Sequence, residues 1–312
     1  KKENLEKMKK CLDAIAGDVP KTTILLAEKC LDEATIDQNL LRQIRTEHTD
    51  RKPLYINFTS GSTGLPKGVA VSHRAVMDFI RIYADTFAVT KEDIIGNQAP
   101  FDFDVSVKDI YTGLLTGAKV QIIPREYFSD PTTLMDYMAD SKMTVLTWAV
   151  SAMCFVSVMN GFAYRTPDTV RKVLFSGEVL PIKHYRVWKK YLPQAMFVNL
   201  YGPTEVTCNC TYYVLDPKRE YELTDVIPIG KAFPNETVFL LDETDQQVTE
   251  AGKAGEICVS SSELALGYYN APDKTAQVFV QNPLNHRYDE RIYRTGDLAK
   301  YDAQGNLVYI SR

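Results

Sequence analysis

Runs rich in apolar residues alternate with helix-like stretches along the first two thirds of the chain. The runs at 54–58, 94–99, 119–123, 144–149, 170–175 and 196–200 have the length and composition of buried strands. Helices are predicted at 73–87, from the segment 101–106 to residue 115, at 131–139 and at 182–191. Strands that alternate with helices in this way predict parallel sheets with crossover helices.

The sequence also marks where two of these helices begin. Ser72 is an N-cap residue type, and it precedes an apolar stripe at helical spacing that consists of Val76, Phe79, Ile80, Tyr83 and Phe87. Asp130 and Pro131 supply an N-cap and a first-turn proline to the helix that ends near residue 139.

The pattern differs at both ends of the chain. Leu5, Met8, Leu12 and Ile15 share one face of a predicted helix, 22–27 is predicted as a short strand, and 29–52 as a loop with a helical turn. After residue 210, short strands at 211–214, 237–242, 255–260, 293–294 and 307–310 are separated by turn residues. We therefore expect an incomplete N-terminal segment (1–54), an α/β body (55–210) and a smaller β-rich part, folded as a small β-barrel (211–312).

Composition and charge narrow the function classes. The chain is 45% hydrophobic, and its net charge of −4 comes from 36 basic and 40 acidic residues that are mixed along the sequence. No basic stripe indicates a nucleic-acid partner, and neither a membrane-spanning apolar run nor a secretory signal is present in the sequence. Six cysteines fit the reduced thiols of a cytoplasmic protein, and the spacing of Cys208 and Cys210 does not suit zinc.

The loop at 59–68 is the first candidate for a chemical role. Gly and hydroxyl residues with one cation can present N–H groups, O–H groups and a positive charge to phosphate oxygens. The spacing around Lys67 is not that of a Walker loop, and a flexible surface turn is the alternative interpretation. The candidate phosphate-binding residues are Thr59, Ser60, Gly61, Ser62, Thr63, Gly64 and Lys67.

Three further polar segments follow predicted strands, where ligands gather in parallel sheets. Asp104 could pair with a substrate ammonium or simply cap a helix. The segment 176–178 contains Gly177 and Glu178. The segment 201–205 offers an aromatic ring, a hydroxyl and the carboxylate of Glu205, an oxygen ligand of the kind Mg²⁺ prefers. Each segment taken alone could also be an ordinary turn or a solvated face.

Taken in order, these segments carry a family resemblance. The stretches 59–68, 103–106, 177–178, 199–205, 267–269 and 293–297 are similar to those of adenylate-forming ligases of the amino-acid-activating kind, which are related to acyl-CoA synthetases and luciferases. The whole pattern is most similar to D-alanine–carrier protein ligase and to the adenylation domains of nonribosomal peptide synthetases. The resemblance covers residue 55 to the end, and residues 1–54 match only loosely.

The resemblance implies a site for ATP and Mg²⁺. Thr59, Ser60 and Lys67 would belong to the triphosphate loop, Thr204 would reach the α-phosphate, and Glu205 would bind Mg²⁺. Asp297 would accept the ribose hydroxyls. Adenine and the hinge would involve Gly177, Glu178, Asn199, Leu200, Tyr201, Gly202, Pro203, Tyr309 and Arg312.

The resemblance also implies an amino-acid pocket, in which Asp104 pairs with the substrate amino group. The implied lining is Asp104, Val105, Lys108, Thr147, Leu174, Ser176, Leu200, Cys208 and Asn209. Several of these residues also resemble serine-activating domains, so D-Ala, L-Ser or a similar small amino acid is expected. A helix lysine is usually solvated, and that is the default for Lys108. The alternative is that it points into the pocket and favours a polar or acidic side chain.

The implied reaction is attack of the amino-acid carboxylate on the α-phosphorus of ATP, followed by capture of the aminoacyl-adenylate by the phosphopantetheine thiol of a carrier protein. The family's bridging lysine lies in a mobile C-terminal domain that would follow Arg312. We therefore expect this chain to bind ATP or adenylate but to adenylate poorly. The rival functions are a non-catalytic ATP-binding module and a carboxylic acid–CoA ligase, of which Asp104 disfavours the latter.

Overall fold

The computed structural model describes Glu6 and the ranges 37–59 and 66–312, and it divides the chain into two compact units, 1–49 and 50–312. In the first unit, helix α3 (Gln38–Glu47) begins at Asp37, whose carboxylate accepts the N–H groups of Asn39 and Leu40. This helix is longer than the single turn expected within 29–52. The helix and strand expected before residue 29 lie outside the described residues.

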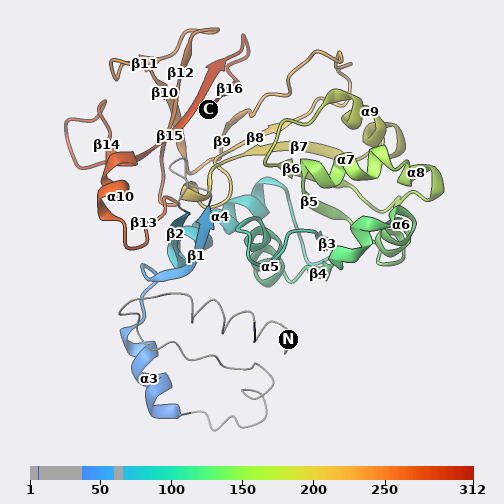
Figure 1. Ribbon diagram of the computed structural model, residues 1–312, viewed down its shortest axis with the longest axis horizontal. Coiled ribbons are helices and arrows are strands. Elements are labelled where there is room, and N and C mark those ends of the chain that lie inside the picture. Colours follow the sequence, from blue (N-terminus) through green and yellow to red (C-terminus); the bar gives the residue numbers. More distant parts are fainter. Residues whose placement is uncertain (1–5, 7–36, 60–65) are drawn as a thin grey trace. The chain divides into compact units, whose positions relative to one another are not determined.

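The second unit contains a seven-stranded sheet in the order β4-β3-β5-β6-β7-β8-β9 (Figure 1). Five strands are parallel: β3 (Ile94–Asn97), β4 (Lys119–Ile122), β5 (Val145–Ala149), β6 (Lys172–Ser176) and β7 (Met196–Tyr201). All five were predicted, because a parallel strand covered on both faces is a continuous apolar run. Strands β8 (Thr211–Val214) and β9 (Lys231–Ala232) extend the sheet in antiparallel pairing.

Alternate residues of the parallel strands enter two different hydrophobic cores. Val145, Leu174 and Val198 pack in one core, with helices α4 (His73–Thr86) and α5 (Val105–Thr116). Their sequence neighbours pack in the other core, with α6 (Pro131–Asp140), α7 (Val150–Val158), α8 (Gly161–Tyr164) and α9 (Ile182–Tyr191). The period of two along each strand therefore separates two helical layers. The predicted caps of α4 and α6 are confirmed, because Ser72 accepts from Ala75 N and Asp130 accepts from Thr132 N.

A second, three-stranded antiparallel sheet has the order β1-β2-β13. Its strands are β1 (Pro53–Thr59), β2 (Lys67–Ser72) and β13 (Gly267–Tyr268). Strands β1 and β2 are the two arms on either side of the 60–65 segment, which lies outside the described residues. This sheet therefore pairs the start and the end of the predicted phosphate loop with each other, and it places the end of the loop beside a strand from much later in the chain.

The third sheet is the β-rich part. It consists of β10 (Thr237–Leu241), β11 (Gln247–Val248), β12 (Ala254–Ser260), β14 (Phe279–Gln281), β15 (Arg291–Tyr301) and β16 (Leu307–Ser311). Helix α10 (Pro272–Val278) precedes β14. Within the described ranges the edge strands β11 and β14 do not pair with each other, so the expected barrel is an open antiparallel sheet.

The mixed α/β fold with a parallel sheet and crossover helices is confirmed, with one correction to its division. Strand 211–214 was expected in the β-rich part, but it pairs with β7 of the α/β sheet, as Leu200↔Tyr212 and Asn199↔Tyr213 show. The domain boundaries themselves stay predictions.

Cys154, Cys208, Cys210 and Cys258 are free thiols. None of the helices in the described ranges is long and apolar enough to cross a membrane.

Two buried glutamates, Glu236 and Glu263, lie close to each other. Glu236 is 8% exposed and Glu263 is fully buried, and their carboxyl groups interact electrostatically with each other. Both Glu236 oxygens and Glu263 Oε2 have no hydrogen-bond partner among the described residues. Asn235 Nδ2 donates to Glu263 Oε1. Burial, and then the neighbouring Glu263, hold the pKa of Glu236 well above its usual value of 4.5. The pair therefore keeps a proton at pH values where an exposed glutamate is ionised.

This pair predicts a pH-dependent stability. Above about pH 4.5 the unfolded chain releases a proton that the folded pair keeps, so the free energy of unfolding falls as pH rises, by up to about 1.4 kcal/mol per pH unit. The Glu236→Gln variant cannot ionise there and keeps the size and polarity of the side chain beside Glu263. We expect thermal unfolding to show a higher Tm than wild type at pH 8, and a smaller loss of Tm between pH 5.5 and 8.

The matched control is Glu250→Gln, which removes an exposed carboxylate from the same part of the chain. It should leave the pH dependence of Tm as in wild type. A Glu236→Gln curve that runs parallel to wild type across this pH range would contradict the retention of a proton by this pair.

Candidate functional site

A cavity of about 440 Å³ lies where the α/β sheet meets the β-rich sheet. It is formed by the ends of β6 and β7 on one side and by β15 and β16 on the other. The predicted residues that line it are Gly177, Glu178, Asn199, Leu200, Tyr201, Gly202, Pro203, Asp297, Tyr309 and Arg312. The structure therefore brings together the residues expected for adenine, ribose and the hinge, which come from four separate segments.

Tyr201 and Asp297 join the two sides of this cavity. The Tyr201 hydroxyl donates to Asp297 Oδ2 at 2.7 Å, and Arg312 Nε lies 3.6 Å from Asp297 Oδ1. The Asp297 N–H donates to Thr295 Oγ1, and this hydrogen bond fixes the backbone from which the Asp297 side chain extends. A carboxylate has about four acceptor sites, so Asp297 keeps capacity for further hydroxyl donors.

Asn199 holds one segment of the cavity wall in place. Its Nδ2 donates to the carbonyl oxygen of Pro228 at 2.9 Å and lies 3.5 Å from that of Ile227. The amide nitrogen thus anchors a segment that itself lines the cavity through Val226, Ile227 and Ile229. Sequence reasoning missed these three apolar residues, because nothing in a short apolar segment between turns distinguishes a cavity wall from a core.

A second cavity, of about 760 Å³, shares Gly202, Pro203 and Arg312 with the first. Its lining includes the predicted phosphate and metal residues Thr59, Lys67, Thr204 and Glu205. Ser60, Gly61, Ser62, Thr63 and Gly64 lie outside the described residues. The two cavities therefore form neighbouring compartments, of which one carries aromatic and carboxylate groups and the other carries a hydroxyl, a cation and a carboxylate.

The connection between β7 and β8 carries the residues at the centre of the site. A Cβ at Gly202 would lie 2.4 Å from Asn209 Cα, so only glycine allows the two arms of this connection to approach each other. Cys210 N donates to Tyr201 O at 2.8 Å and closes the turn. Thr207 and Cys208 have positive φ angles of 48° and 75°, which are uncommon for residues with a side chain.

Asp104 lies beside this connection. It stands at the N-cap position of α5, but its side chain makes no capping hydrogen bond, so the simple helix-cap interpretation is not supported. Burial raises the pKa of the Asp104 carboxyl, against the opposing effects of a hydrogen bond with Thr204 and the charge of Lys108. The Cys208 thiol lies 3.3 Å from Asp104 O. Asp104 is thus a half-buried carboxyl next to the phosphate compartment.

Lys108 corrects one prediction. It is 0% exposed, so the default of a solvated helix lysine is wrong. Its Nζ donates to Asn209 Oδ1 at 2.7 Å, and burial lowers the pKa of its ammonium group. The next residue, Asp109, is also buried, accepts from Asn97 Nδ2 at 2.9 Å, and has a pKa raised to about 7 by burial.

The remaining residues of the expected amino-acid pocket lie in or beside the parallel sheet. Thr147 Oγ1 and Tyr83 OH are 2.9 Å apart, and Leu174 and Leu200 are buried in the same core as α4 and α5. Ser176 ends β6, and Val105 begins α5. Sequence reasoning missed Tyr55, whose buried hydroxyl lies near the Cys208 thiol and the Asp104 carboxyl.

Glu205 fits a divalent cation. It is buried, lines the larger cavity, and accepts from Tyr268 OH at 2.7 Å through Oε1. No cluster of three or more His, Cys, Asp or Glu side chains suitable for a metal occurs among the described residues. One carboxylate suits Mg²⁺, which keeps several waters and binds through one or two carboxylates together with phosphate oxygens.

Comparisons with known proteins agree with this geometry. A family model described as AMP-binding enzyme matches residues 1–269. One component of mycosubtilin synthase from Bacillus subtilis is 34% identical over 266 residues, which cover 83% of this chain and 10% of that protein. Tyrocidine synthase 1 of Brevibacillus parabrevis is 31% identical over 288 residues, which cover 90% of this chain and 25% of that protein. The chain thus spans a quarter or less of these relatives.

A solved structure is similar over the same region. It is that of holo-PA1221, an NRPS protein containing adenylation and PCP domains bound to a vinylsulfonamide inhibitor. The similarity has a TM-score of 0.74 at 30% identity and covers 85% of this chain and 45% of that chain.

The geometry around Asp297 predicts its effect on nucleotide binding. Asp297→Asn keeps the shape and can still accept from Tyr201, but it removes the negative charge. Hydrogen bonds to a charged acceptor contribute about 1.5–3 kcal/mol, so we expect calorimetry to show a dissociation constant for ATP that is roughly tenfold or more higher.

A ribose role has a specific signature. A 2′,3′-dideoxy analogue of ATP lacks the hydroxyls that Asp297 would accept, so the substitution should change its affinity little. The control variant Asp289→Asn removes an exposed carboxylate and should bind both nucleotides as wild type does. An equal loss of affinity for ATP and the dideoxy analogue would argue against hydroxyl recognition.

Proposed function

The chain belongs to the family of AMP-binding enzymes, and we propose that it activates a small amino acid by ATP-dependent adenylation. The aminoacyl-adenylate would then be transferred to the phosphopantetheine thiol of a carrier protein. D-Ala, L-Ser and similar small amino acids are the candidate substrates.

One observation carries this proposal: the two cavities meet at Gly202 and Pro203, and Asp104 lies beside Thr204 at that junction. A nucleotide with its adenosine in the smaller cavity and its phosphates in the larger one would have its α-phosphate near the junction. An amino acid whose ammonium pairs with Asp104 would then have its carboxylate close to the same point.

The roles follow from the chemistry of each compartment. Asp297 would accept ribose hydroxyls, and the Tyr201 ring would face the adenine. Thr204 would donate to the α-phosphate, while Thr59 and Lys67 would hold the leaving pyrophosphate. Glu205 would hold Mg²⁺, which neutralises phosphate charge when it is bound. The protein thus positions the reactants for in-line attack and stabilises developing charge, and it needs no nucleophile of its own.

The proposal of a carrier protein as partner rests on similar proteins and not on a surface of this chain. Two similar proteins are named as synthases of mycosubtilin and tyrocidine, and the similar solved structure contains a PCP domain beside its adenylation domain. A carrier domain encoded beside this chain would be the corresponding partner.

Pyrophosphate exchange tests the proposal. The assay uses the protein together with any domain encoded after Arg312, because the chain by itself is expected to adenylate poorly. It compares D-Ala, L-Ala, Gly, L-Ser, L-Thr and L-Asp, with a fatty acid and an aryl acid as non-amino acids. Exchange that depends on one small amino acid supports the proposal. Exchange with only the acids that lack an amino group would indicate a carboxylic acid–CoA ligase. ATP binding without any exchange would indicate a non-catalytic binding module.

The role of Asp104 can be tested by binding alone. We expect Asp104→Asn to weaken an alanyl-sulfamoyladenosine, a stable analogue of the adenylate, by roughly tenfold or more, since a partly buried carboxylate–ammonium pair is lost. The propionyl analogue differs only by the missing amino group, and its affinity should stay within about twofold, on the order of 0.4 kcal/mol. Equal weakening of both analogues would show that Asp104 does not recognise the amino group.

Lys108 offers a test of substrate choice. If its buried ammonium faces the bound side chain, Lys108→Met should lower the affinity for seryl- and aspartyl-sulfamoyladenosine relative to the alanyl analogue, because a polar or anionic group loses a charged donor. The measurement is the ratio of dissociation constants across the three analogues. An unchanged ratio would mean that Lys108 serves only to hold Asn209.

A further inference from the structure

Tyr268 contacts two oppositely charged residues of the phosphate compartment. Its hydroxyl donates to Glu205 Oε1 at 2.7 Å, and Lys67 Nζ lies 4.8 Å from the centroid of its ring. Lys67 and Glu205 line the same cavity, and the ion pairs of the described residues do not include one between them. The tyrosine thus holds a cation on its ring face and a carboxylate at its hydroxyl.

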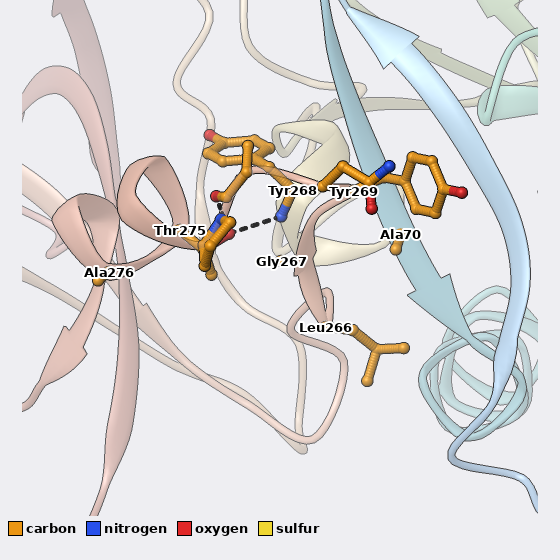
Figure 2. Close-up of a pocket in the computed structure, with 10 residues that line it drawn as sticks. Ala70, Leu266, Gly267, Tyr268, Tyr269, Thr275 and Ala276 are labelled. Atoms are coloured by element: carbon orange, nitrogen blue, oxygen red, sulfur yellow. Dashed lines mark hydrogen bonds between the residues drawn. The ribbon is translucent and has the colours of Figure 1, made fainter. Parts of the chain in front are cut away.

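Two contacts hold the backbone of Tyr268 in place. In β13 it pairs with Val69 of β2, the strand that carries Lys67. Its N–H donates to Thr275 Oγ1 at 2.9 Å, and that hydroxyl donates to Ala271 O at 2.9 Å (Figure 2). Gly267 has φ +139°, and a Cβ there would lie 2.5 Å from Thr275 Cγ2. Only glycine therefore lets α10 approach closely enough to anchor the tyrosine.

The connection that carries Glu205 is held from the same side. Ala265 N donates to Glu205 O at 2.8 Å, three residues before Tyr268. The segment 265–268 therefore contacts Glu205 twice: Ala265 binds the Glu205 backbone, and Tyr268 binds the Glu205 side chain. The position of Glu205 relative to β2 is set through this segment.

We propose that Tyr268 is a positioning residue that keeps the Lys67 ammonium and the Glu205 carboxylate apart, so that the ammonium stays available to phosphate and the carboxylate to a divalent cation. Opposite charges that line one partly desolvated cavity attract each other strongly. A direct Lys67–Glu205 pair would occupy both groups. The proposal rests on the proposed function, because it assigns a phosphate and a divalent cation to this cavity.

Two substitutions separate the two contacts. Tyr268→Phe keeps the ring under Lys67 but releases Glu205, whereas Tyr268→Leu removes both contacts. Losing a partner of a metal ligand commonly costs tenfold or more in metal affinity. The phenylalanine variant should therefore change the dependence of nucleotide binding on Mg²⁺, and the leucine variant should in addition weaken binding that does not need the metal.

The experiment titrates Mg²⁺ at fixed ATP and protein concentrations and measures bound ATP by equilibrium dialysis. For Tyr268→Phe we expect the Mg²⁺ concentration at half-maximal ATP binding to rise roughly tenfold. Binding in the presence of a chelator should equal that of wild type. For Tyr268→Leu, ATP binding in the chelator should fall as well.

Tyr269→Phe is the matched control. Tyr269 is the next residue, 55% exposed, and its ring points away from that of Tyr268 in Figure 2. It should titrate as wild type. A Tyr268→Phe titration that superposes on wild type overturns the inference and leaves the proposed function standing. If the wild-type chain binds no ATP at any Mg²⁺ concentration, the proposed function itself fails.

The anchoring residue gives a second route if Tyr268→Phe does not fold. Thr275→Val removes the hydroxyl that accepts from Tyr268 N, and Thr275→Ser keeps it. The valine variant should shift the Mg²⁺ midpoint upward and the serine variant should restore it. A valine variant with wild-type Tm and a wild-type midpoint would overturn the positioning role.

Discussion

The reversal of the chain between β7 and β8 is the constraint on which the site depends. The parallel order of the sheet ends at β7, and the next strand runs back along it. The turn is closed by the bond from Cys210 N to Tyr201 O, and it is possible only because Gly202 has no side chain facing Asn209. Within these few residues the connection carries the hydroxyl of Thr204 and the carboxylate of Glu205. This rigid reversal of the chain thus fixes the distance between the Thr204 hydroxyl and the Glu205 carboxylate, which an ordinary loop would leave variable.

Neighbouring segments hold this reversal against its own strain. Thr207 and Cys208 have left-handed backbones, which cost free energy unless the surroundings enforce them. Thr207 Oγ1 donates to Glu263 O at 2.5 Å, so the loop between β12 and β13, which carries one of the two buried glutamates, also holds the strained residue. Tyr201 binds Asp297 at the other end of the reversal. The β-rich sheet therefore supports the centre of the site from two sides.

The sequence predicted the features that depend on local pattern. The parallel strands, the caps at Ser72 and Asp130, and the loop order all follow from short stretches. Helix α7 was missed because Val150–Val158 is apolar around most of its circumference and lacks a helical stripe. Helix α10 was missed for the opposite reason, since none of its residues is buried. The sheet to which β8 belongs depends on its partner, and the burial of Lys108 depends on Asn209, 101 residues away. Neither is encoded in the local sequence.

The electrostatics around Asp104 explain why an amino group is the expected partner of this carboxyl. A carboxylate that is removed from water without a cation is unfavourable, and burial raises the pKa of Asp104 accordingly. The charge of Lys108 acts on Asp104, but the Lys108 ammonium is bound to Asn209, and the described ion pairs do not include one between Lys108 and Asp104. The desolvation cost at Asp104 is therefore left partly uncompensated in the free protein. A substrate ammonium would relieve it, whereas an acid without an amino group would leave it in place. Selectivity of this kind arises from the penalty that the wrong ligand incurs as much as from attraction to the right one.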